Sequence, residues 1–147
     1  MTQLDQFLAK FTPEVRKVAR AALAKMRKRL PGAVQLIYDN YNALAIAFGP
    51  TDRRSDIVLS IALYPRWVSL FFMHGTALPD PKKLLRGTGA TIRHIVLEDA
   101  SALDEPAVEA LIAAAVKLAD PPFEASRRGR SVVKMALEKQ RARRPRA

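Results

Sequence analysis

The residues best suited to chemistry gather in one stretch of the chain, around a loop that follows an apolar segment. Glycine amides and cationic side chains in such a loop can hold an anionic group. We therefore predict an anion-binding surface on the loop 75–93. Its candidate ligand-binding residues are His74, Asp80, Lys82, Lys83, Arg86, Gly87, Gly89 and Arg93.

The same loop also has a purely structural interpretation, which the residue pattern favours. The run Pro79-Asp80-Pro81 is typical of a short helical turn, and Gly87 supplies a left-handed residue to end it. The glycines precede a strand rather than open a helix, so the loop is neither a P-loop nor a dinucleotide-binding fingerprint. Both interpretations remain open.

Other reactive side chains give no catalytic pattern. The chain has no cysteine, so a thiolate nucleophile or thiolate metal site is excluded. His74 and His94 are the only histidines, and neither has a carboxylate at ligand spacing. An acidic cluster could bind iron or magnesium weakly, but stabilisation of a helix dipole explains the same pattern with no ion and is the preferred interpretation. Its members are Glu98, Asp99, Asp104, Glu105 and Glu109. We expect no enzyme activity, no cofactor and no catalytic or metal-ligating residue.

Positive charge is concentrated at the C-terminal end. The net charge is +11, and residues 124–147 carry nine basic side chains against two acidic ones. Such a tail attracts polyanions such as nucleic acids, or it simply keeps a frayed terminus in solution. The candidate polyanion-binding residues are Arg127, Arg128, Arg130, Arg141, Arg143 and Arg144.

Hydrophobic periodicity predicts the elements that would position these groups. Thr12-Pro13-Glu14 indicates a helix start, and apolar residues then recur at helical spacing until Pro31-Gly32. A second helix follows Ser101 and ends before Pro121-Pro122. Between the helices, alternating segments predict five strands. The expected strands are 34–39, 44–48, 56–64, 67–73 and 91–97.

The aromatic residues gather in these predicted strands. Some could line a pocket or stack on bases, as on a sheet platform, although strand aromatics are mostly core residues. The set comprises Tyr38, Tyr41, Phe48, Tyr64, Trp67, Phe71 and Phe72.

Three segments together resemble the signature of the YdhG-type bacterial domain of unknown function. They are the stretch from Phe71 to Leu97, the run Tyr38-Asp39-Asn40-Tyr41-Asn42-Ala43-Leu44, and the turn Tyr64-Pro65-Arg66-Trp67. The likeness covers residues 4–119 and implies a frataxin-like fold, with iron delivery proposed for some members. Here the expected first helix is cationic and carries Glu14 as its one acid, which is unsuited to a ferrous ion.

We therefore expect an α+β protein built as a two-layer sandwich. It would have an antiparallel sheet of about five strands, with two helices on one face. Residues 1–122 would form this domain, and residues 123–147 a basic, helical C-terminal tail. The expected function is a non-enzymatic, cytoplasmic binding module for an anionic ligand or partner. The alternatives are nucleic-acid binding through the tail and first helix, or frataxin-like iron binding; no membrane partner is expected, and the oligomeric state stays open.

Overall fold

The computed structural model describes residues 1–145, which form an α+β fold with an open six-stranded sheet and three α-helices. The α-helices are α1 (Gln3–Leu8), α2 (Pro13–Arg29) and α3 (Pro106–Lys117). The strands are β1 (Val34–Asp39), β2 (Leu44–Gly49), β3 (Leu59–Leu63), β4 (Val68–Phe72), β5 (Arg93–Leu97) and β6 (Arg130–Ala136). Short 3-10 helices are η1 (Arg54–Asp56), η2 (Gly75–Ala77) and η3 (Ala100–Asp104). None of the described helices is long and apolar enough to cross a bilayer.

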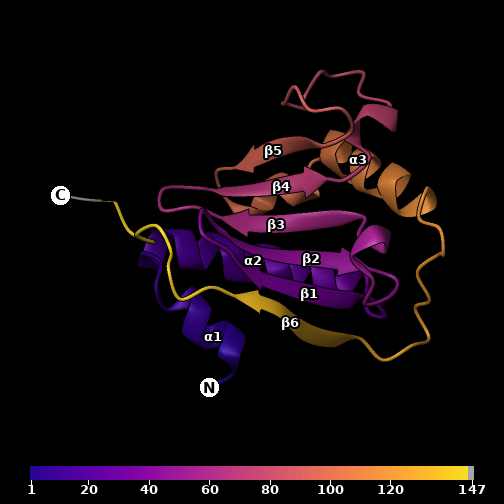
Figure 1. Ribbon diagram of the computed structural model, residues 1–147. Coiled ribbons are helices and arrows are strands. Elements are labelled where there is room, and N and C mark those ends of the chain that lie inside the picture. Colours follow the sequence, from indigo (N-terminus) through magenta and orange to yellow (C-terminus); the bar gives the residue numbers. More distant parts are fainter. Residues whose placement is uncertain (146–147) are drawn as a thin grey trace.

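The sheet has the strand order β5-β4-β3-β2-β1-β6. Strands β1 to β5 pair antiparallel with their neighbours, as expected, whereas β6 pairs parallel with β1. Helices α2 and α3 lie behind the sheet in Figure 1, and the strands face the viewer. One face of the sheet is therefore covered by helices and the other is not.

Helix α2 begins and ends where the sequence predicts. The Thr12 hydroxyl accepts a hydrogen bond from the Val15 amide, and Pro13 occupies the first turn, where its missing N–H costs nothing. The buried stripe runs along one side of the helix and packs on the sheet. Its members are Val15, Ala19, Ala22, Leu23 and Met26.

The two faces of the sheet carry side chains of different size. On the helix-covered face, one cross-strand row is made only of branched aliphatic residues: Val133, Ile37, Ile46, Ile61, Leu70 and Ile95. On the open face, the adjacent row is small in the middle and larger at its ends: Met135, Tyr38, Ala45, Ala62, Ser69 and Val96. Large residues fill the space under the helices, while small ones leave the open face hollow.

The expected helical tail is wrong, because its central part is a strand. β6 runs along β1 from Val34↔Arg130 to Asp39↔Ala136, with an irregularity between Ile37 and Tyr38. The chain therefore has no structural break at residue 122, since the segment after it completes the same sheet. The β1–β6 ladder gives the backbone of this segment its hydrogen-bond partners. An isolated charged helix of similar length would be only marginally stable in water.

A buried ion pair fixes the chain beyond β6. The Arg143 guanidinium donates to the Asp39 carboxylate at 2.9 Å, and both side chains are at most 4% exposed. The same guanidinium donates to the main-chain oxygens of Asn40 and Ala43. Lys10 from the N-terminal side donates to the second Asp39 oxygen at 3.1 Å. Arg143 is therefore a structural residue and is not available to a polyanion.

We expect Arg143→Ala to lower the free energy of unfolding by about 3 kcal/mol, because Asp39 would stay buried without its main partner. Urea denaturation measures the loss. Arg128 is the matched control, since it is exposed and makes no ion pair among residues 1–145. Arg128→Ala should change stability by less than about 0.5 kcal/mol. If Arg143→Ala and Arg128→Ala both lower the free energy of unfolding by a similarly small amount, the C-terminal segment is an appendage and not part of the fold.

Candidate functional site

The loop 75–93 uses several of its polar groups to hold its own shape. The Asp80 carboxylate accepts hydrogen bonds from the amides of Leu84 and Leu85, both at 2.9 Å. Lys83 and Gly87 adopt positive φ angles of 54° and 124°. The helical turn expected to end at Gly87 instead closes at Lys83, whose amide donates to the Asp80 carbonyl oxygen at 3.1 Å. Asp80 is thus a turn-capping residue in this structure.

Arg93 is also occupied inside the loop. Its guanidinium donates to the carbonyl oxygens of Gly89 and Ile92 at 2.6 and 2.7 Å. The base of its side chain lies against Gly75, where an added Cβ would come within 2.4 Å of the Arg93 Cβ. Gly75 is therefore required by close packing. The other cations of the loop are exposed, and their binding role stays a prediction; they are Lys82, Lys83 and Arg86.

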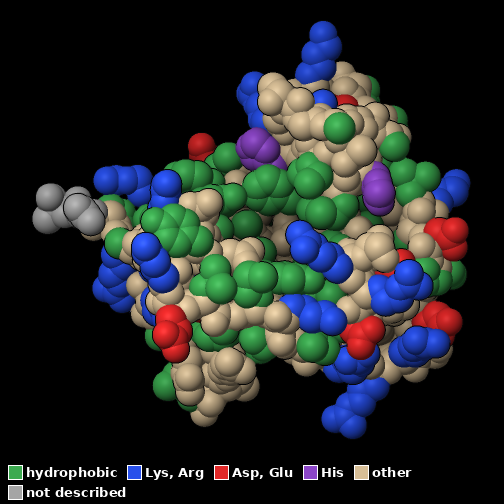
Figure 2. Space-filling model, viewed as in Figure 1, with side chains coloured by type: hydrophobic (Ala, Val, Ile, Leu, Met, Phe, Trp, Pro, Cys, Tyr) green, Lys and Arg blue, Asp and Glu red, His purple; other side chains and the backbone are tan. Residues whose placement is uncertain are grey.

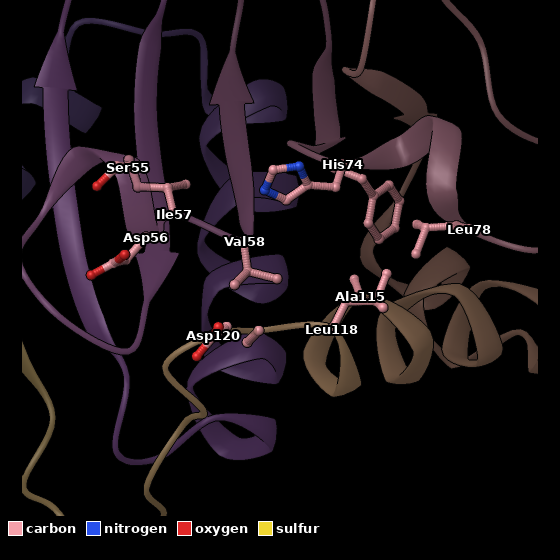
Figure 3. Close-up of a pocket in the computed structure, with 11 residues that line it drawn as sticks. Ser55, Asp56, Ile57, Val58, His74, Leu78, Ala115, Leu118 and Asp120 are labelled. Carbon is pink, nitrogen blue, oxygen red and sulfur yellow. The ribbon is translucent and has the colours of Figure 1, made fainter.

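His74 lies apart from these cations, in a pocket of about 130 Å³ between η1, the end of β4 and the end of α3. Figure 3 shows its ring pointing into the pocket near Val58, while Asp56 and Asp120 lie farther along the wall. Asp56 accepts a hydrogen bond from the Thr51 hydroxyl at 2.6 Å. The second histidine, His94, instead packs against the Phe71 ring at 5.2 Å. The histidines are therefore not brought together.

The acidic cluster is divided among structural contacts. Asp104 pairs with Lys25 at 2.6 Å, and Asp99 caps η3 by accepting a hydrogen bond from the Ser101 amide. The Ser101 hydroxyl and that amide lower the pKa of Asp99 below its usual value. Within the described part of the chain, no three histidine or acidic side chains are grouped to hold a metal ion.

The remaining C-terminal cations do not form one patch. Arg127 pairs with Glu124 at 2.8 Å, and Arg130 pairs with Asp52 at 3.2 Å. Arg144 donates to the Lys10 and Ala9 carbonyl oxygens. Arg141 lies 5.6 Å from the centre of the Tyr41 ring. Among the candidate polyanion-binding residues, Arg141 is therefore the one placed beside the exposed ring of Tyr41.

A wide hollow lies on the open face of the sheet, and we call it the open-face trough. It encloses about 510 Å³ and crosses from the β1–β2 turn to β4. Its floor is made of Ala45, Ser60 and Ala62, which belong to cross-strand rows of small side chains. The walls are larger residues: Asn40, Tyr41, Asn42, Tyr64, Phe71, Met73 and Leu137. Ser60 is only 7% exposed although no described helix covers it, because the walls rise around it.

At the β3–β4 turn the wall is formed by Tyr64, whose ring is stacked on a second ring outside the lining. Tyr64 and Trp67 stack with centroids 4.7 Å apart and planes 14° from parallel. The turn that brings them together is closed by the Tyr64 amide, which donates to the Trp67 carbonyl oxygen at 2.9 Å. Trp67 remains 42% exposed. Burial raises the pKa of the Tyr64 phenol, which is thus uncharged at neutral pH and does not repel an anion.

Acidic side chains do not line the trough, although one follows a wall residue in sequence. Among residues 1–145, no Asp or Glu lines it. Asp39, next to the wall residue Asn40, lies on the other face of β1 with Arg143, whereas Glu138, next to the wall residue Leu137, is exposed. Figure 2, viewed onto this face, shows hydrophobic side chains in a band with a hollow, and both basic and acidic side chains around it. The trough therefore combines a floor of small side chains with an uncharged lining.

Comparison with known proteins gives no match to this chain: no family model, no curated protein and no solved structure. The likeness to the YdhG-type domain accordingly stays a prediction.

Sequence reasoning named the wall aromatics but missed the trough floor. Ala45, Ser60 and Ala62 carry no reactive group, so no search for chemistry selects them. The signal present in the sequence was the second face of the strand around Ser60 and Ala62, where small residues alternate with large apolar ones. That pattern indicates a face with no helix packed on it.

Asp80→Ala should lower the free energy of unfolding by about 2 kcal/mol, because two amides lose a charged acceptor. Asp80→Asn, which keeps one acceptor oxygen, should lose less. The exposed neighbour supplies the control: Lys82→Ala should stay within about 0.5 kcal/mol of the parent protein in the same urea titration. If Asp80→Ala leaves the free energy of unfolding unchanged, the two hydrogen bonds do not stabilise the fold, and a ligand-binding role for Asp80 becomes the better explanation.

Proposed function

We propose that this protein is a non-enzymatic binding module that holds an anionic ligand or partner in the open-face trough. The observation that carries the proposal is the trough itself: an apolar floor on the uncovered face, aromatic walls, and no acidic lining among the described residues. Concave sites that combine apolar surface with a few oriented polar groups are typical of ligand binding. Here the Asn40 and Asn42 side chains supply the polar groups on one wall.

Charge around the trough supports the anionic character of the ligand. Arg66 lies two residues after Tyr64 in the β3–β4 turn, and Arg141 lies over the Tyr41 ring at the opposite wall. Both side chains are exposed, and neither makes an ion pair within residues 1–145. Free guanidinium groups beside an apolar surface raise the local concentration of anions and pair with them after binding.

The alternatives have weaker support. Polyanion binding by residues 124–147 and the first helix would lose the cations that are paired within the protein, as Arg127, Arg130 and Arg143 are. Iron binding would need a ligand set, and two of the acids proposed for it are engaged elsewhere: Asp99 caps η3 and Asp104 pairs with Lys25. A frataxin-like relationship through the YdhG-type family remains part of the proposal on the sequence resemblance alone.

The dye anilinonaphthalene sulfonate, an aromatic anion, is a direct probe of this site. We expect saturable binding with a rise in dye fluorescence and an affinity that falls with salt. Ala45→Glu places a carboxylate beside the floor and should weaken binding about tenfold. Ala45→Lys adds similar bulk with the opposite charge and should weaken binding less.

Ala24→Glu is the matched control, because Ala24 is exposed on α2 behind the sheet. It should bind the dye as the parent protein does. If Lys83→Ala or Arg86→Ala abolishes binding while Ala45→Glu has no effect, the loop 75–93 is the site instead. If no variant changes the affinity, the dye is held elsewhere and the trough proposal is wrong.

A further inference from the structure

Two exposed aromatic groups stand at the same end of the sheet, on neighbouring hairpin turns. Tyr41 lies in the turn between β1 and β2 and is 41% exposed. Trp67 closes the turn between β3 and β4, stacked on Tyr64. Because two hairpins of one sheet lie two strand spacings apart, the turns are separated by roughly 10 Å. The trough runs between them and is lined by both Tyr41 and Tyr64.

Each of these aromatic groups has a cation next to it. The Arg141 guanidinium lies over the Tyr41 ring and is held there by its own amide, which donates to the Tyr41 carbonyl oxygen at 2.9 Å. Arg66 directly precedes Trp67 and is exposed. At the far side of the trough, the Phe71 ring is paired with the His94 ring at 5.2 Å. The surface thus carries two exposed aromatic groups, one with a guanidinium over its ring and one with an exposed arginine next to it in sequence.

This arrangement fits a ligand that carries flat rings and negative charges in alternation. Bases stack on aromatic side chains whatever their sequence, while the phosphates that link them meet arginine and lysine. The two asparagine side chains on the wall can donate to and accept from base edges. A mononucleotide could occupy one aromatic group, but it would leave the second ring and its cation unused.

We propose that the partner of the open-face trough is single-stranded nucleic acid, with bases stacked on Tyr41 and on the Tyr64–Trp67 pair. This inference rests on the proposed function and narrows its ligand class. A duplex is disfavoured because its base faces are stacked on one another and are not available to Tyr41 or Trp67. The net charge of +11 supplies the long-range attraction to a polyanion.

The chain contains a single tryptophan, Trp67, which is stacked on the trough-lining Tyr64, so its fluorescence reports base stacking at that pair. The probe is an oligouridylate of about twelve nucleotides, long enough to span the trough. We expect saturable quenching of Trp67 fluorescence, with an affinity that falls steeply with salt. Inorganic polyphosphate of similar length is the base-free comparison and should bind, if at all, without quenching.

Variants separate stacking from charge. Tyr41→Ala should weaken oligouridylate binding at least fivefold, whereas Tyr41→Phe keeps the ring and should retain the affinity. Arg141→Ala should lower the slope of log affinity against log salt by about one. Lys17→Ala, on the exposed side of α2, should change neither the quenching nor the affinity.

Three results would overturn the inference. In the first, polyphosphate binds as tightly as oligouridylate, oligouridylate does not quench Trp67 fluorescence, and Tyr41→Ala leaves the affinity unchanged. The surface would then bind anions without base stacking. In that case the proposed function would stand and this narrower inference would fail. Equal affinity for a duplex of the same length would exclude the single-strand preference. Absence of binding to oligouridylate, polyphosphate and the dye would overturn both proposals.

Discussion

Helices cover only one face of this sheet, and the character of the other face follows from that asymmetry. A sheet face that meets a helix layer needs bulky side chains to fill the space, and the row through Ile37, Ile46 and Ile61 provides them. A face open to water would expose that bulk at a cost in free energy. Its central positions are instead Ala45, Ser60, Ala62 and Ser69. Ala47 lies beside them in a separate buried cluster with Val34, Leu36 and Ile57. Small residues limit the exposed apolar area and at the same time create the trough.

The two edges of the sheet are built differently. On the β1 side, β6 pairs with a strand that would otherwise present unpaired amides, and the Asp39–Arg143 pair holds the chain that follows. On the β5 side, Arg86 forms an isolated antiparallel bridge with His94 through hydrogen bonds of 2.9 Å in both directions. The loop 75–93 therefore has a structural task that accounts for much of its distinctive sequence. It returns along the sheet and covers part of an edge.

Local signals in the sequence predicted most of the body and failed at the C-terminal segment. The Thr12-Pro13 start of α2 and the turns at Asn40–Asn42 and Tyr64–Trp67 depend on residues next to one another, so sequence alone determines them. β6 depends on β1, which lies far away along the chain. Its residues are mostly exposed, so the run Val132, Val133, Met135 and Leu137 shows no clear period and suits a helix equally well. An edge strand with little buried surface leaves only a weak pattern in the sequence.

The burial of Arg143 was unpredictable for a related reason. In sequence it is one arginine among several, and only the geometry of the β1 end selects it for Asp39. Strand alternation places Tyr38 on the open face and Asp39 on the helix-covered face, so the Asp39 charge is neutralised away from the ligand surface. The same segment sets Arg141 over Tyr41, two residues before Arg143. One buried ion pair therefore serves the fold and the candidate site together. It keeps an acid out of the trough and fixes the chain that brings a cation to its wall.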